Sequence, residues 1–194
     1  MDSENAAPDL PPYSLDVQAM DLGPGVKAVG LELIETESRE PLRGEEAAAI
    51  WSGALEALAG TEPYVVDFFS HLDRVRDFAA SHAIGLREAA ARCVVVPQPT
   101  KELLRLLVGR FESETFGLRV GPAAANGDAA LENELSHRGL DAYQQAYSRY
   151  TCCAICEPGD GWVTLLSETL WPSEIIRRVR PALQAYDVYI ARPQ

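Results

Sequence analysis

The residues best suited to chemistry are three cysteines within five positions of each other, Cys152, Cys153 and Cys156. In a loop or at the start of a helix, the C-x-x-C spacing of Cys153 and Cys156 can hold a metal ion or form a redox pair. We expect a strand here, however, so Cys153 and Cys156 face apart, and Cys152 and Cys156 lie roughly 13 Å apart at ~3.3 Å per residue. A disulfide needs Cα atoms within about 7 Å. We therefore predict buried thiols, no metal and no cofactor, and keep a thiol or metal function only as an alternative.

The three histidines do not suggest a metal site either. His71 and His82 are eleven residues apart, which on one helix is roughly 16 Å along the axis and too far to bind a single ion. His137 lies two residues before Gly139, where we expect a helix to bend. A catalytic role there would need a partner that sequence spacing does not supply, so we name no catalytic residue.

Tyrosines recur at helical spacing along the following segment, at Tyr143, Tyr147 and Tyr150. Such a stripe is typical of a helix face that packs on a sheet, with the hydroxyl groups reaching the rim. The alternative is a small-molecule site, in which Tyr143, Tyr147 and His137 line a pocket between this helix and the sheet.

One basic run and two tryptophans complete the candidate binding residues: Arg177, Arg178 and Arg180, with Trp162 and Trp171 on either side of an expected strand. An arginine cluster can bind carboxylates or phosphates, and here it could also bind the acidic first quarter of another copy and give a homo-oligomer. Exposed tryptophans serve as contact anchors at protein interfaces. A solvent-exposed helix face and a core position are the ordinary interpretations of these residues.

Motifs for nucleotide and acyl chemistry are missing from the sequence. There is no G-x-S-x-G, no S-x-x-K, no phosphate-binding loop and no G-x-G-x-x-G after a strand. The net charge of −12 argues against nucleic acid and anionic membranes, since both require Lys and Arg. Neither a secretory signal nor a run of ~18 apolar residues is present. We therefore expect a cytoplasmic protein, and its few lysines beside many arginines suggest a bacterial source.

The elements of the first half follow from hydrophobic spacing. Residues 1–25 are rich in proline and acid without a period, which predicts a flexible arm. Alternation predicts a first strand over 26–35. The helices expected from a period of three to four residues cover 45–59, 61–82, 86–93 and 100–111. Residues 94–96 are either a helix end or a buried strand.

The last eighty residues alternate between strand and helix. The expected elements are a strand over 116–120, a helix over 128–150, strands over 151–157 and 162–168 joined by a Pro-Gly-Asp-Gly turn, a helix from 172 that Pro181 kinks or ends at Arg180, and a strand within 187–193. This β-α-β-β-α-β order is that of the ferredoxin-like arrangement. We predict an α+β fold whose mixed or antiparallel sheet carries helices on one face. It is one cooperative unit made of the arm, a helix-rich half over 26–112 and a ferredoxin-like half over 113–194.

Acidic residues are concentrated at the start of the chain. The first 50 residues hold eleven carboxylates and three basic residues, a net charge of −8. An acidic surface can steer a basic partner into contact. We therefore predict a non-enzymatic protein of inhibitor, immunity or regulatory type, which binds a basic protein through carboxylates and aromatic anchors. The tyrosine-lined pocket, for a ligand or a substrate, is the alternative.

Overall fold

A computed structural model of the chain describes residues 10–23, 25–68, 72–85, 87–90, 93–96, 104–105, 115–125 and 140–191. The strands are β1 (Tyr13–Asp21), β2 (Lys27–Glu35), β3 (Tyr64–Phe68), β4 (Arg87–Ala90), β5 (Cys93–Val96), β6 (Phe116–Val120), β7 (Cys152–Glu157), β8 (Trp162–Leu166) and β9 (Val188–Ile190). The helices are α1 (Gly44–Ala59), α2 (Leu72–Ser81), α4 (Pro122–Ala125), α6 (Leu140–Ala146) and α7 (Pro172–Leu183). Single 3₁₀ turns are η1 (Tyr147–Arg149), η2 (Pro158–Asp160) and η3 (Gln184–Tyr186).

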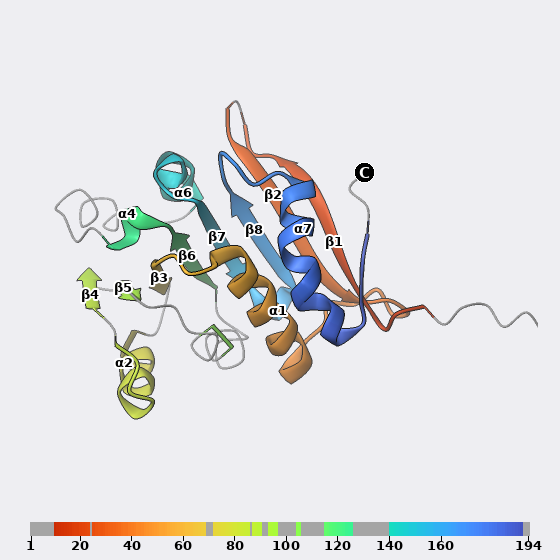
Figure 1. Ribbon diagram of the computed structural model, residues 1–194, viewed down its shortest axis with the longest axis horizontal. Coiled ribbons are helices and arrows are strands. Elements are labelled where there is room, and N and C mark those ends of the chain that lie inside the picture. Colours follow the sequence, from red (N-terminus) through yellow and green to blue (C-terminus); the bar gives the residue numbers. More distant parts are fainter. Residues whose placement is uncertain are drawn as a thin grey trace, which may run out of the picture.

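The described strands form one nine-stranded sheet in the order β4-β5-β3-β6-β7-β8-β2-β1-β9 (Figure 1). Neighbouring strands are antiparallel throughout, except for β1 and β9, which are parallel. The sheet is therefore mixed, and the α+β class predicted from the sequence is confirmed. Within the described ranges, no helix is both long and apolar enough to cross a bilayer.

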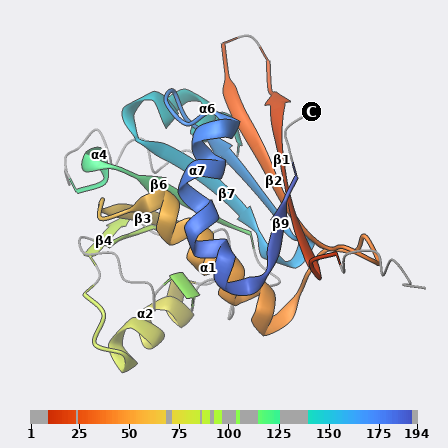
Figure 2. The same cartoon turned by 45° about the vertical axis from the view of Figure 1, so that its right-hand side comes forward.

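The main core lies between one face of the sheet and the pair α1 and α7. Alternate residues of the strands point into it, which is the pattern expected of a half-buried strand; they include Leu15, Val17, Leu31, Leu33, Val163 and Leu165. The two helices lie side by side across this face (Figure 1, Figure 2). Helix α1 is the helix predicted over 45–59, with Glu45 and Glu46 in its first turn and Gly60 beyond its end at φ 60°. Gly60 takes this positive φ without the steric cost that a side chain would bring.

A second, smaller core lies on the opposite face, under α6. Tyr143, Ala146 and Tyr147 pack there against Val65 and Cys153 of the sheet. The expectation that helices cover only one face is therefore wrong. Tyr143 of α6 and Tyr147 of the following turn η1 give this segment an apolar side to bury, and the sheet offers β3, β6 and β7 for it.

Three elements of the first half differ from their predictions. The flexible arm expected over 1–25 does not hold for Tyr13–Asp21, which forms β1. The helix expected over 61–82 begins only at Leu72, because Tyr64–Phe68 forms a central strand between β5 and β6. A continuous apolar run such as Tyr-Val-Val has no period that separates helix from a strand buried on both faces.

The helix expected over 86–93 is replaced by β4 and β5, which make residues 94–96 a strand. Most of the helix expected over 100–111 and the first part of the helix expected over 128–150 lie outside the described residues. The link expected over 121–128 contains the short helix α4.

The C-terminal strands and helices occur where the sequence predicts them, but the ferredoxin-like order is not confirmed. That arrangement separates its first two strands by another strand and makes them parallel, whereas β6 and β7 are antiparallel neighbours. The hairpin of β1 and β2 lies between β8 and β9 in the sheet. Helix α7 continues through Pro181 to Leu183 and does not end at Arg180. The division of the chain into two halves stays a prediction.

Candidate functional site

Four side chains form a row across the face of the sheet opposite α1 and α7. Cross-strand pairing sets Glu157 of β7 opposite Trp162 of β8, Trp162 opposite Glu32 of β2, and Glu32 opposite Asp16 of β1. Directly opposed residues share one face of a sheet. All four side chains are half-buried. We call Asp16, Glu32, Trp162 and Glu157 the acidic row.

The acidic row places like charges next to each other, which destabilises a sheet. Asp16 is partly compensated, because Arg39 Nη2 lies 3.6 Å from its Oδ2 and Ser14 Oγ donates a hydrogen bond of 2.9 Å to its Oδ1. Within the described part of the chain, neither Glu32 nor Glu157 takes part in an ion pair. The row therefore carries negative charge that the described cations do not neutralise.

Trp162 is held in a fixed position within this row. Its indole Nε1–H donates to Thr164 Oγ1 at 2.9 Å. The ring lies against the backbone of Gly30, where an added Cβ would come within 2.6 Å of the ring atom Cζ2. A strand glycine of this kind permits the close approach of a neighbouring side chain. The sheet thus presents an oriented aromatic group between two carboxylates.

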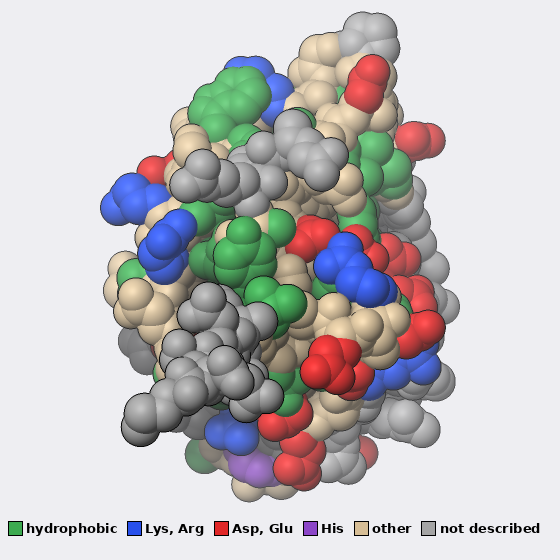
Figure 3. Space-filling view, turned by 90° about the vertical axis from the view of Figure 1, so that its right-hand side faces the viewer, with side chains coloured by type: hydrophobic (Ala, Val, Ile, Leu, Met, Phe, Trp, Pro, Cys, Tyr) green, Lys and Arg blue, Asp and Glu red, His purple; other side chains and the backbone are tan. Residues whose placement is uncertain are grey.

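Further residues extend this face toward the sheet edge. Gln18 pairs with Gly30, and Tyr189 of β9 pairs with Ser14. Tyr189 is 54% exposed. Figure 3 views the molecule from the side of β1 and β9 and shows acidic side chains gathered over one half of that surface, beside hydrophobic ones. Among the described residues, the acidic row and its surroundings therefore place carboxylate, amide and aromatic groups on one face of the sheet.

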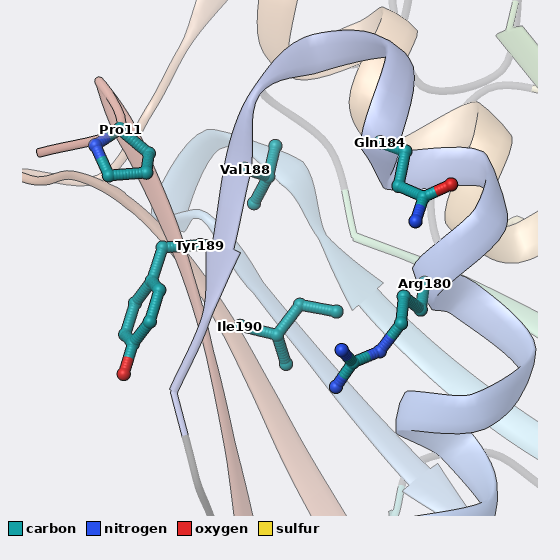
Figure 4. Close-up of a pocket in the computed structure, with 6 residues that line it drawn as sticks. All are labelled: Pro11, Arg180, Gln184, Val188, Tyr189 and Ile190. Atoms are coloured by element: carbon teal, nitrogen blue, oxygen red, sulfur yellow. The ribbon is translucent and has the colours of Figure 1, made fainter.

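A small hollow of about 260 Å³ lies beside this edge, between α7 and β9 (Figure 4). Arg180 of α7, Gln184 of η3 and Val188 and Ile190 of β9 line it, together with Pro11 and Tyr189. Arg180 points toward Ile190, while Tyr189 points to the other side of the strand (Figure 4). The hollow offers one cation and one amide among apolar walls.

The other two arginines of the predicted basic cluster bind Glu174. Arg177 donates two hydrogen bonds of 2.7 Å to this carboxylate, and Arg178 donates one of 2.9 Å. These contacts lower the pKa of Glu174 to about 2. Of the three arginines, Arg180 lines the hollow, while Arg177 and Arg178 share their charge with Glu174.

The predicted tyrosine pocket is filled by its own side chains in the described residues. Tyr143 and Tyr147 are buried. The Tyr143 hydroxyl donates to Asp67 Oδ2 at 3.3 Å, and the Tyr147 hydroxyl donates to the carbonyl oxygen of Gly25 at 3.1 Å. His137, the third residue expected there, lies outside the described residues. The geometry at α6 gives the pocket hypothesis no support.

Sequence reasoning missed a buried ion pair beneath Tyr143. Arg119 Nη1 lies 3.4 Å from Asp67 Oδ2, and the two side chains are 0% and 7% exposed. The Arg119 guanidinium also lies over the Tyr143 ring, 4.2 Å from its centre. The only available signal was a charged residue inside each of two apolar strands. The cluster joins β3, β6 and α6 within the smaller core.

The three cysteines are buried in β7 as predicted, with Cys152 and Cys156 on the α1 side and Cys153 on the α6 side. Burial raises the pKa of Cys152 to about 12 and also raises the pKa of Cys156. In the described ranges, no three His, Cys, Asp or Glu side chains are placed to hold a metal ion. All three thiols are shielded from solvent, and those of Cys152 and Cys156 stay protonated at neutral pH, which suits packing more than catalysis.

Trp171, the second predicted anchor, lies apart from the acidic row at the start of α7. It is 54% exposed, and Lys27 Nζ lies 5.0 Å from the centre of its ring. Lys27 also forms an ion pair of 3.3 Å with Glu168. The structure thus separates the two tryptophans and brings only Trp162 into contact with the acidic surface.

No model of a known protein family matches the chain, and neither the curated proteins nor the solved structures give a significant match.

Proposed function

We propose that this chain is a non-enzymatic, regulatory or inhibitory protein whose open sheet face binds a basic surface of another protein. The observation that carries this proposal is the acidic row, in which three carboxylates and one tryptophan lie in register across four strands. Like charges directly opposite each other oppose folding, so a face that retains them is better explained by a cationic ligand than by stability.

The electrostatics of the row suit guanidinium and ammonium groups. A guanidinium can donate two parallel hydrogen bonds to one carboxylate and is the common partner of exposed acidic groups at interfaces. A cation placed between Glu32 and Asp16 would relieve a repulsion that is on the order of 0.2–1 kcal/mol for such a pair. Electrostatic steering by the net charge of −12 would also speed the encounter.

Trp162 supplies the second component of an interface. Tryptophan and tyrosine carry much of the binding energy at protein contacts, especially when they are surrounded by residues that exclude water. The ring of Trp162 is already oriented by Thr164 and Gly30. Little conformational entropy would therefore be lost on binding.

The test compares two variants with the same change in net charge. The first, Asp16→Asn with Glu32→Gln and Glu157→Gln, neutralises the acidic row. The control, Glu37→Gln with Glu40→Gln and Asp77→Asn, removes three exposed carboxylates elsewhere.

A partner captured from host extract by the wild-type chain is purified, and its affinity for each variant is measured by calorimetry at low and moderate salt. We expect the first variant to bind at least tenfold more weakly and to lose most of the salt dependence. Equal affinities of both variants would refute the proposed site.

A further inference from the structure

Strand β1 has one edge that is only partly paired. Strand β2 pairs with its whole length from Tyr13 to Asp21, whereas β9 pairs on the other side with Tyr13–Leu15 alone. Among the residues that the structure describes, no strand lies outside the remainder of β1, residues 16–21. We call this stretch the open edge. Natural proteins usually protect such edges, because their backbone groups can pair with another chain.

The direction of the backbone groups along the open edge follows from two hydrogen bonds. The Leu15 carbonyl accepts a hydrogen bond of 3.0 Å from the amide of Ala191, so the backbone N–H and C=O groups of Leu15 point away from β2. The Pro12 carbonyl accepts one from the amide of Thr36, on the β2 side. Backbone groups alternate in direction along a strand. The N–H and C=O groups of Val17, Ala19 and Asp21 therefore point away from β2.

The exposed residues of the open edge adjoin the acidic row, whereas Val17 is buried. Gln18, Ala19 and Asp21 are exposed. Asp16 and Gln18 belong to the same face as Glu32. A strand added at this edge would place every second side chain next to Asp16 and Gln18, within reach of the acidic row.

We propose that the open edge binds an extended segment of the basic partner by strand addition, with lysine or arginine at alternate positions over the acidic row. This inference rests on the proposed function and adds its binding mode. Main-chain hydrogen bonds to the exposed residues Ala19 and Asp21 would supply affinity, and the carboxylates would select basic side chains, which is the usual division in strand addition.

Charge favours a basic partner over two other occupants of the open edge, which are a second copy of the protein and another segment of the same chain. A second copy paired edge to edge would bring together two edges that each contain Asp16 and Asp21, and each chain carries a net charge of −12. The first 50 residues carry a net charge of −8, so acidic segments of the same chain are disfavoured for the same reason. A basic segment has the opposite sign.

The test uses a synthetic peptide with alternating lysine and threonine, and a second peptide in which the backbone nitrogens on one edge are methylated. Binding to the full chain is measured by calorimetry. The variant Ala19→Pro removes one outward N–H and is compatible with an edge strand, while Ala19→Val keeps that N–H and serves as the control. We expect Ala19→Pro and the methylated peptide each to weaken binding by about tenfold, as the loss of a main-chain hydrogen bond implies.

Hydrogen exchange provides a readout that does not depend on the variants folding normally. Binding of the unmodified peptide should slow exchange of the amides of Ala19 and Asp21 in the wild-type chain. If the neutralised acidic row loses binding while methylation and Ala19→Pro have no effect, strand addition is refuted and the proposed function stands. If neutralising the row has no effect, the proposed function itself fails. A dimer that forms in ultracentrifugation and is lost in Ala19→Pro would instead assign the edge to a second copy.

Discussion

Replacing Asp67 by Asn removes the negative charge that faces Arg119 and leaves the size of the side chain unchanged. Arg119 is 0% exposed, and its Nη1 lies 3.4 Å from Asp67 Oδ2. The substitution therefore removes the Asp67 charge that faces a fully buried guanidinium, and it also weakens the acceptor of the Tyr143 hydroxyl.

The expected cost follows from the burial of the pair. Removing one partner of a buried ion pair costs about 3–5 kcal/mol, because the remaining charge is poorly solvated. For a chain of this length, each kcal/mol lowers Tm by roughly 2–4 °C. We therefore expect Asp67→Asn to lower Tm by about 6–20 °C. The control Asp77→Asn, at an exposed position of α2, should change stability by no more than about 0.5 kcal/mol.

Urea denaturation followed by circular dichroism measures the free energy of unfolding of each variant. The double variant Asp67→Leu with Arg119→Met removes both charges, and buried pairs replaced in this way are often neutral or stabilising. We expect it to be more stable than Asp67→Asn. Two results would refute the reasoning that the pair is buried and coupled. One is a cost below about 1 kcal/mol for Asp67→Asn. The other is a double variant that is less stable than Asp67→Asn.

The remaining predictions concern packing, thiols and pH. Gly117→Ala should destabilise the fold by about 1–3 kcal/mol or more in urea denaturation, because the new Cβ would lie 1.6 Å from the Tyr143 hydroxyl oxygen; unchanged stability would contradict the close approach of α6. At pH 8, Cys152 and Cys156 should react with Ellman's reagent only as the protein unfolds, since burial raises the pKa of both thiols; prompt labelling located by mass spectrometry would count against this. Glu174→Gln should lower Tm slightly at pH 7. Because the pKa of Glu174 is lowered from 4.5 to about 2, the wild-type advantage in Tm should be present above pH 4.5 and disappear as the pH falls toward 2. An advantage that persists below pH 2 would contradict this assignment.

Strong local signals in the sequence predicted their elements well. Helix α1 has acidic residues in its first turn, a periodic apolar face and Gly60 at its end. The turn between β7 and β8 contains Gly161 in a left-handed conformation, as its Pro-Gly-Asp-Gly sequence predicts. In both cases the local preference and the tertiary structure agree, which is why spacing alone was sufficient.

The errors have a shared physical origin in packing between distant segments. Tyr64–Phe68 pairs with β5 and β6 on either side, and such contacts override a helical period. The acidic row joins residues 16, 32, 157 and 162, whose proximity depends on the insertion of the β1–β2 hairpin beside β8. Of these four, only Trp162 was singled out from the sequence, because register across strands is not encoded in any one segment.

The most direct test of the acidic surface is a nuclear magnetic resonance titration of the labelled chain with its purified partner. The indole N–H of Trp162 lies in the acidic row, while that of Trp171 lies at the start of α7, so the two signals report on different surfaces. We predict that the Trp162 indole and the amides of Glu32 and Asp16 shift in step with partner concentration, while the Trp171 indole does not. Shifts confined to Trp171 and α7, with Trp162 unchanged, would contradict the proposal that the open sheet face is the binding site.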